Sequence, residues 1–160
     1  MSKLLLAPAL LFTLFFASTT AFADEAGDCS NAAGSYLTGK VTTAPTYKSG
    51  KPLKGVELSH THVTITADQD GKSYDVAMDN VFAAGYDSAV QAVPSPLSSI
   101  AKGDHLSLCG QLYSGGSLGI HWVHTNCGVT PTSAKPNGWV KKVGDKANME
   151  DSTKYCGLWN

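Results

Sequence analysis

The stretch HLSLCGQLYSGGSLGIHWVHT, residues 105–125, is the part of the sequence that decides the fold. Its first half, residues 105–113, alternates apolar and polar side chains, which is the pattern of a half-buried strand. The run Ser-Gly-Gly-Ser at residues 114–117 is a turn signal, and a second β-type run follows it over residues 118–125. The stretch therefore predicts a β-hairpin and an all-β fold.

The two glycines at the centre of that turn, Gly115 and Gly116, also predict the register of the hairpin. Successive strand residues point to opposite faces of a sheet, so His121 and His124 fall on different faces. In this register His121 shares the face of the apolar residues and is expected to be a buried imidazole. His124 is expected to face solvent. A bulge near Val123 would exchange the two faces.

Further segments of the chain supply the other strands and one helical insertion. Residues 36–43, 56–67 and 73–78 are rich in β-branched and aromatic residues, and residues 138–141 are expected to form a short strand or a docking loop. The region 81–100 is small and polar and contains Pro94 and Pro96, so we expect only short helical turns there, chiefly at residues 96–101. This element order predicts a small, OB-like antiparallel barrel of about five strands, with a β-sandwich fragment as the alternative.

The N-terminal region has the features of a secretory signal peptide, residues 1–23. Lys3 precedes an apolar run, and Ala21 and Ala23 are the small residues that a signal peptidase reads. The run is too short for a transmembrane helix, which needs about 20 apolar residues, so no membrane anchor is expected. We therefore expect export to the periplasm or the extracellular space. The remaining chain divides into a loose lead-in at 24–34, a barrel domain at 35–143 and a tail at 144–160.

All four cysteines lie after the predicted leader. An even number of cysteines in an exported chain favours disulfides over free thiols. Four cysteines can pair in three ways, and we favour a disulfide between Cys29 and Cys109 and another between Cys127 and Cys156. The second bridge would tie the polar tail to the barrel.

The charged residues are lysine, aspartate and glutamate, without any arginine, and the formal net charge is −1. The guanidinium of arginine, which makes paired hydrogen bonds to phosphates and guanine bases, is therefore missing. Binding of long nucleic acid by bulk electrostatics is disfavoured. The expected partner is a small or polymeric ligand, and a short nucleic acid stays among the candidates.

His60 and His62 are two residues apart in a predicted strand, so both imidazoles should lie on one face, opposite Val63 and Ile65. Two imidazoles on one face could bind a divalent metal, for which a catalytic site would need a third protein ligand. The candidates for that ligand are His105, His124 and Asp79. The alternative is an exposed strand face with two ordinary histidines and no cofactor.

Three functions follow from these features, and the first is favoured. It is a non-catalytic binding module whose ligand is an oligosaccharide, a short nucleic acid or a protein. The second is a metal-dependent hydrolase or nuclease that uses His60, His62 and His124 with Asp79 or Asn126. The third is a structural or envelope-stress protein. The residues expected at the binding surface are Trp122, His124, Asn126, Trp139 and His105.

Several short motifs together resemble a family of small exported bacterial proteins of unknown function. They are Lys-Gly-Asp at 102–104, Gly-Gln-Leu-Tyr at 110–113, Ile-His-Trp-Val-His at 120–124 and Asn-Gly-Trp-Val at 137–140. The resemblance implies a compact OB-like barrel and no particular reaction. This chain has Asp79 where the family pattern has histidine, and Thr125 and Asn126 where it has histidine and aspartate. A metal or acid–base site built on those positions would have lost ligands.

Overall fold

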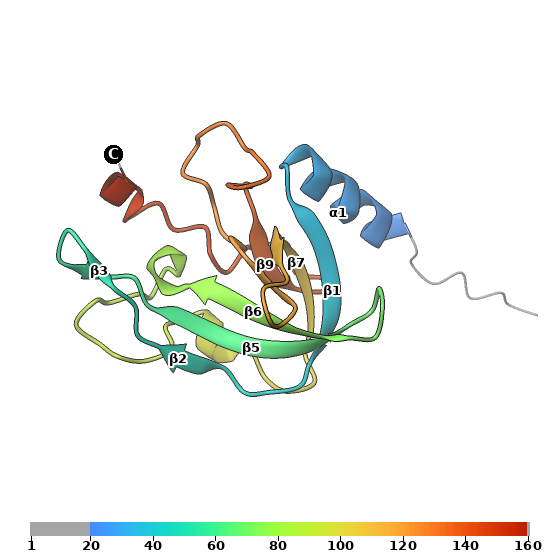
Figure 1. Cartoon of the computed structure of the whole chain (residues 1–160), viewed down its shortest axis with the longest axis horizontal. Helices are drawn as coiled ribbons and strands as arrows, with labels where there is room; N and C mark the ends of the chain where they lie inside the picture. The colour runs from blue at the N-terminus through green and yellow to red at the C-terminus, as the bar shows by residue number, and fades with distance from the viewer. Residues whose placement is uncertain (1–19, 160) are drawn as a thin grey trace, which may run out of the picture.

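The computed structural model describes residues 20–159, and most of the regular structure among them is β-strand (Figure 1). The predicted leader at residues 1–23 falls largely outside this part of the chain. Within residues 20–159 no helix has the length and apolar character needed to cross a membrane.

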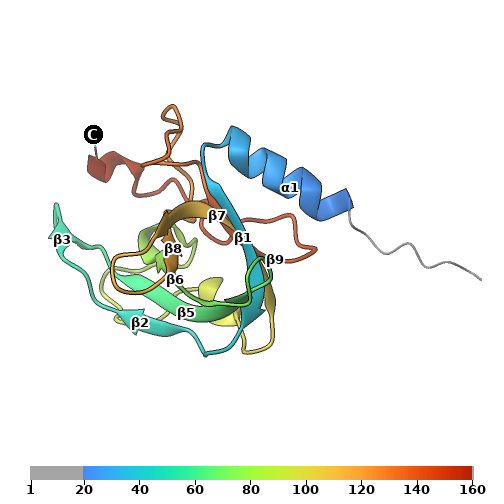
Figure 2. The same cartoon turned by 45° about the vertical axis from the view of Figure 1, so that its right-hand side comes forward.

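Five strands follow one another around a closed barrel, which Figure 2 shows approximately end-on. Their order around the ring is β1 (Ser35–Val41), β5 (His60–Ala67), β6 (Ser73–Asp79), β8 (Gly119–His121) and β7 (His105–Tyr113), with β7 pairing again with β1. The fold is therefore the expected small OB-like barrel.

The barrel is mixed, whereas the sequence predicted an antiparallel one. Four neighbouring pairs are antiparallel, and β6 pairs with β8 in parallel. The reason is parity: strand direction must alternate around an all-antiparallel ring, and an odd number of strands cannot close with full alternation. One parallel pair is the minimum that a closed ring of five strands requires.

Smaller elements decorate this ring. A short strand, β9 (Trp139–Lys142), pairs with the first half of β7 and fills the edge that the short β8 leaves open. The segment predicted as one strand over residues 56–67 is interrupted, so β4 is separate from β5. The remaining elements are α1 (Thr20–Asn31), β2 (Thr46–Lys48), β3 (Pro52–Leu53), β4 (Val56–Glu57), η1 (Asn80–Phe82), η2 (Leu97–Ser99) and η3 (Cys156–Trp159).

The core fills the inside of the ring with aliphatic side chains from every barrel strand. On β5 the burial alternates as predicted: Val63 and Ile65 are buried, while His60 and His62 lie on the outer side. Leu112 is the exception on β7, because it is exposed rather than on the core side with the other leucines. The buried residues of the ring include Leu37, Val41, Val63, Ile65, Val76, Met78, Leu106, Leu108 and Ile120.

The expected loose lead-in at residues 24–34 is mostly helix, because α1 extends to Asn31. Glu25 docks this helix on the barrel. Its Oε2 accepts hydrogen bonds from the hydroxyls of Ser107 at 2.6 Å and Tyr36 at 2.9 Å, and its Oε1 lies 2.7 Å from Nζ of Lys141. Burial alone would raise the pKa of Glu25, but these three partners lower it below its ordinary value. The sequence pattern missed this helix because tertiary contacts, rather than apolar periodicity, hold it.

Both predicted disulfides are present. Cys29 at the end of α1 is bonded to Cys109 of β7, and Cys127 is bonded to Cys156 at the start of η3. The first bridge passes close to Gly34, where a Cβ atom would lie 2.4 Å from the nearer sulfur and 2.9 Å from the other. The second bridge ties the C-terminal tail to the segment after β8, as expected.

Candidate functional site

The hairpin that contains the histidines has a register one residue away from the predicted one. Gln111 pairs with His121 and Leu112 with Ile120, and the loop at residues 114–118 is longer than a turn of two central glycines. The strand ends at His121 because Trp122 has a φ of 55°, which breaks the regular extended backbone. The regular strand that the sequence predicted is therefore broken at Trp122, one residue before the place where a bulge was the alternative.

This change reverses the predicted burial of the two histidines. His124 is only 2% exposed, whereas His121 is partly exposed and touches the ring of Tyr113 edge-on at 5.4 Å. The prediction that His121 is the core imidazole and His124 the solvent-facing one was wrong. Burial lowers the pKa of His121, and Asp79 partly opposes that effect.

His124 is held between an aromatic stack and two acceptors. Its ring stacks parallel to that of Phe82, with 3.9 Å between the ring centroids, and its centroid lies 4.8 Å from that of Trp122. Nδ1 lies 2.6 Å from the carbonyl oxygen of Thr125, and Nε2 lies 3.0 Å from Oδ2 of Asp79, although not aligned as a hydrogen bond. Each ring nitrogen of His124 therefore faces an oxygen atom, one from the backbone and one from Asp79.

Asp79 joins two imidazoles at the end of β6. Its Oδ1 pairs with Nε2 of His60 and its Oδ2 with His124. Burial alone would raise the pKa of Asp79, but the two histidines lower it well below its ordinary range. The same contact with Asp79 raises the pKa of His60, against the opposing effect of burial. We call His60, Asp79 and His124 the Asp79 cluster.

His62 belongs to a neighbouring pair rather than to this cluster. Its Nδ1 lies 2.9 Å from Oδ2 of Asp75, which also accepts a hydrogen bond from the hydroxyl of Tyr113 at 2.7 Å. The ring centroids of His60 and His62 are 6.2 Å apart. Across residues 20–159 the structure brings together no group of three His, Cys, Asp or Glu side chains that could hold a metal ion.

The other sequence candidates lie in different places. His105 is exposed and pairs with Asp68 in the turn between β5 and β6, at 2.6 Å, and so does not join His124. Asn126 is buried and shapes its own loop: its side chain donates to the carbonyl of Val129 and accepts from the amide of Gly128. Trp139 lies on β9, where it lines a pocket.

That pocket, which we call the Trp139 pocket, has a volume of about 430 Å³. Its walls come from α1, from the segments on either side of β9 and from β9 itself. One aromatic ring lies among amides, carboxylates and ammonium groups. The residues that line it are Asp28, Ala32, Thr125, Asn137, Gly138, Trp139, Lys141, Lys146, Asn148 and Asp151.

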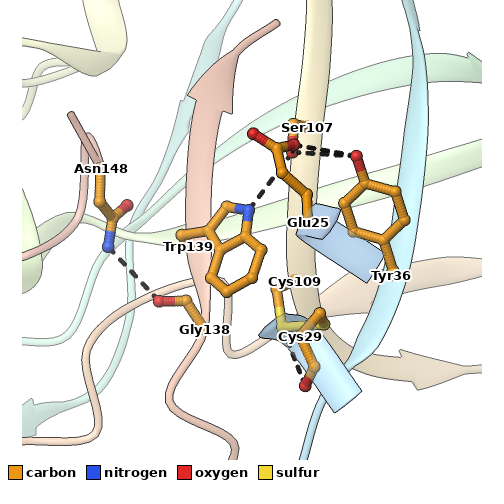
Figure 3. The surroundings of a disulfide bond; sticks show 8 residues. All are labelled: Glu25, Cys29, Tyr36, Ser107, Cys109, Gly138, Trp139 and Asn148. Carbon is orange, nitrogen blue, oxygen red and sulfur yellow. Dashed lines mark hydrogen bonds between the residues drawn. A yellow bond between two sulfur atoms is a disulfide. The ribbon is translucent and has the colours of Figure 1, made fainter. Parts of the chain in front are cut away.

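A hydrogen-bond network fixes the indole of Trp139 (Figure 3). Its Nε1 donates to Oγ of the buried Ser107 at 3.3 Å, and Ser107 in turn donates to Glu25 of α1. Nζ of Lys141 lies 5.3 Å from the centre of the indole. The ring is therefore held by α1, β7 and β9 together before any ligand arrives.

Gly138 and Asn148 determine the shape of the opposite side. A Cβ atom on Gly138 would lie 2.2 Å and 2.3 Å from two backbone carbonyl oxygens, so only glycine allows the chain to pass there. The side-chain amide of Asn148 donates to the carbonyl of Gly138 and accepts from the amide of Val140. It thereby fastens the segment after β9 to the strand.

The sequence singled out only Trp139 among the pocket residues. Its other walls come from segments far apart in the chain, and the helix that supplies Asp28 was not expected. The Gly138-Trp139 pair is the signal that could have pointed to this place. Glu150, a buried acid beside the pocket, was missed entirely.

The fold and the pocket together define a small, disulfide-braced OB-like barrel with a polar pocket at its side. No protein-family model matches the chain, and no curated protein matches it.

Proposed function

We propose that this protein is an exported, non-catalytic binding module that holds a neutral sugar unit of an oligosaccharide in the Trp139 pocket. The observation that carries the proposal is the pocket itself, in which one fixed indole is surrounded by hydrogen-bonding side chains. Sugar rings offer apolar C–H faces that pack on an aromatic ring and hydroxyls that need donors and acceptors. The volume of about 430 Å³ lies in the range of small-molecule sites.

The charges favour a neutral ligand over a phosphate chain. Asp28 and Asp151 balance Lys141 and Lys146 around the pocket, so its lining carries no excess of positive charge. Lys141 is also engaged by Glu25 at 2.7 Å. A nucleic acid strand would require uncompensated cations along its backbone. Between an oligosaccharide and a nucleic acid, the charges of the lining therefore favour the oligosaccharide.

The test is titration of the protein with neutral chito-, cello- and malto-oligosaccharides, followed by NMR. We expect the indole N–H resonance of Trp139 to shift with at least one series. Asp28→Ala and Asp151→Ala should weaken that binding, and Asp145→Ala, an exposed residue outside the pocket lining, should not.

Two results would overturn the proposal. One is the absence of any shift at millimolar sugar, and the other is equal binding by the pocket variants and the Asp145→Ala control. A shift with a short single-stranded oligonucleotide and none with the sugars would replace the oligosaccharide by the nucleic acid alternative.

Export is part of the same proposal. Two disulfides support it, because such bonds persist in oxidising compartments. The intact mass of the protein recovered from the periplasm or medium should correspond to a chain that begins at Asp24. A mass that retains residues 1–23, or four free thiols, would contradict export.

A further inference from the structure

The side-chain carboxyl group of Glu150 is enclosed in the protein. Its exposed fraction is 0%, and within residues 20–159 neither of its carboxyl oxygens has a hydrogen-bond partner. A carboxylate in such a place would forfeit its hydration and gain nothing in return. Burial, together with the nearby negative charge of Asp79, raises the pKa of Glu150 well above its ordinary value. The enclosed form is therefore the neutral acid.

The backbone of Glu150 is hydrogen-bonded to residues that line the Trp139 pocket. Its carbonyl oxygen accepts from the amide of Thr125 at 3.0 Å and from the side chain of Asn148 at 3.1 Å. Its own amide donates to Oδ1 of Asn148 at 3.0 Å. Thr125, Asn148 and the next residue, Asp151, all line the pocket. The short segment of residues 148–151 therefore contributes both the buried side chain of Glu150 and two residues of the pocket wall, Asn148 and Asp151.

The carboxylate of Asp79 would repel the charged form of Glu150. Asp79 of β6 is the ionisable group that acts on it, and Asp79 already holds two imidazoles, His60 of β5 and His124 after β8. His121 of β8 is coupled to the same cluster and is shifted by burial towards its neutral form. The negative charge of Asp79 therefore opposes ionisation of Glu150.

We propose that Glu150 is a proton-operated latch: as a neutral acid it holds residues 148–151 in place as a wall of the Trp139 pocket, and loss of its proton displaces that wall. The consequence for ligand affinity rests on the proposed function, whereas the movement of the wall does not. Sugar binding should be strong while Glu150 is protonated and should weaken as the pH rises. With one proton involved, the affinity falls by at most about tenfold per pH unit above the midpoint.

The first experiment needs no ligand. The sequence contains only three glutamates, Glu25, Glu57 and Glu150, so the carboxyl carbons of labelled protein can be followed individually by NMR from acid to alkaline pH. We expect one carboxyl to titrate well above the ordinary glutamate value of 4.5 and to be missing in Glu150→Gln. The backbone amides of residues 148–151 should change with the same midpoint, while those of residues 37–39 in β1, a strand without histidine, should not follow that midpoint.

The matched variants separate a latch from general instability. Glu150→Gln keeps the shape of the neutral acid, so its wall should stay in place throughout the titration, whereas Asp145→Asn should behave like the wild type. Three results would overturn the latch: Glu150 titrating at or below 4.5, wall amides that do not follow the midpoint of Glu150, or amides of residues 37–39 that change together with the wall. If Glu150→Gln does not fold, the wild-type titration decides alone.

Chito-oligosaccharide binding across the same pH range separates the two proposals. If the wall moves but the protein binds no sugar, the proposed function is refuted and the latch is not. If sugar binding does not change across the titration of Glu150, the latch is refuted and the proposed function is not.

Discussion

Removing the imidazole of His124 should destabilise the protein far more than removing that of His121. His124→Ala deletes a side chain that is 2% exposed, breaks its ion pair with Asp79 and ends its stack on Phe82. Breaking a buried pair costs about 3–5 kcal/mol, and the lower end applies because Asp79 is 25% exposed and keeps His60. The lost stack adds about 1 kcal/mol. We therefore expect a loss of about 3–4 kcal/mol.

The matched control is His121→Ala, which loses an edge contact with Tyr113 on a partly exposed face. Its cost should stay near or below about 1 kcal/mol. Urea unfolding of the oxidised protein at neutral pH measures both. With a slope of about 2 kcal/mol per molar urea, the midpoint of His124→Ala should fall by about 1.5–2 M. Equal midpoints for the two variants, or a larger loss in His121→Ala, would refute the placement of both histidines.

Three further predictions concern the frame around the site. Gly138→Ala should lower the free energy of unfolding by about 2 kcal/mol or more, measured in urea, because its new Cβ meets backbone oxygens. The control Gly27→Ala has nothing within 4 Å of its new Cβ and should be neutral or stabilising. Comparable losses in the two variants would contradict this prediction. Replacing Cys127 and Cys156 by serine should cost about 3.5 kcal/mol in the chain-entropy account for their separation of 29 residues, and a loss under about 1 kcal/mol would disagree. The pKa of Asp79 is lowered in the folded protein, so the wild type should exceed Asp79→Asn in free energy of unfolding by its full amount above pH 3.8. This difference should shrink as the pH falls below 3.8, and a difference that grows in acid would contradict the prediction.

Local sequence patterns were enough to predict the barrel. The alternation at His60 to Ile65 placed two imidazoles outside and two aliphatic residues inside, and the structure agrees. Turn signals placed the long strand β7 at its observed bounds. The cysteine pairing was also correct. These features depend on residues that are close in sequence, or on the small number of ways in which four cysteines can pair.

The candidate site could not be predicted in the same way because it depends on one backbone angle and on distant segments. The positive φ of Trp122 ends β8 early and turns His124 inward, towards Asp79. Trp122 is an unusual residue for that conformation, so no residue type at this position predicts the turn. The Trp139 pocket also needs α1, whose docking depends on the contacts of Glu25 with Ser107 and Lys141.

The bridge between Cys29 and Cys109 also bears on how related sequences should vary. Its two sulfurs occupy the space that a side chain at position 34 would need, so Gly34 is tied to the presence of the bridge. A homologue that lacks both cysteines is released from this restriction and can accept alanine or serine there. Covariation of position 34 with the cysteine pair is therefore the signature that this disulfide should leave in the evolutionary record.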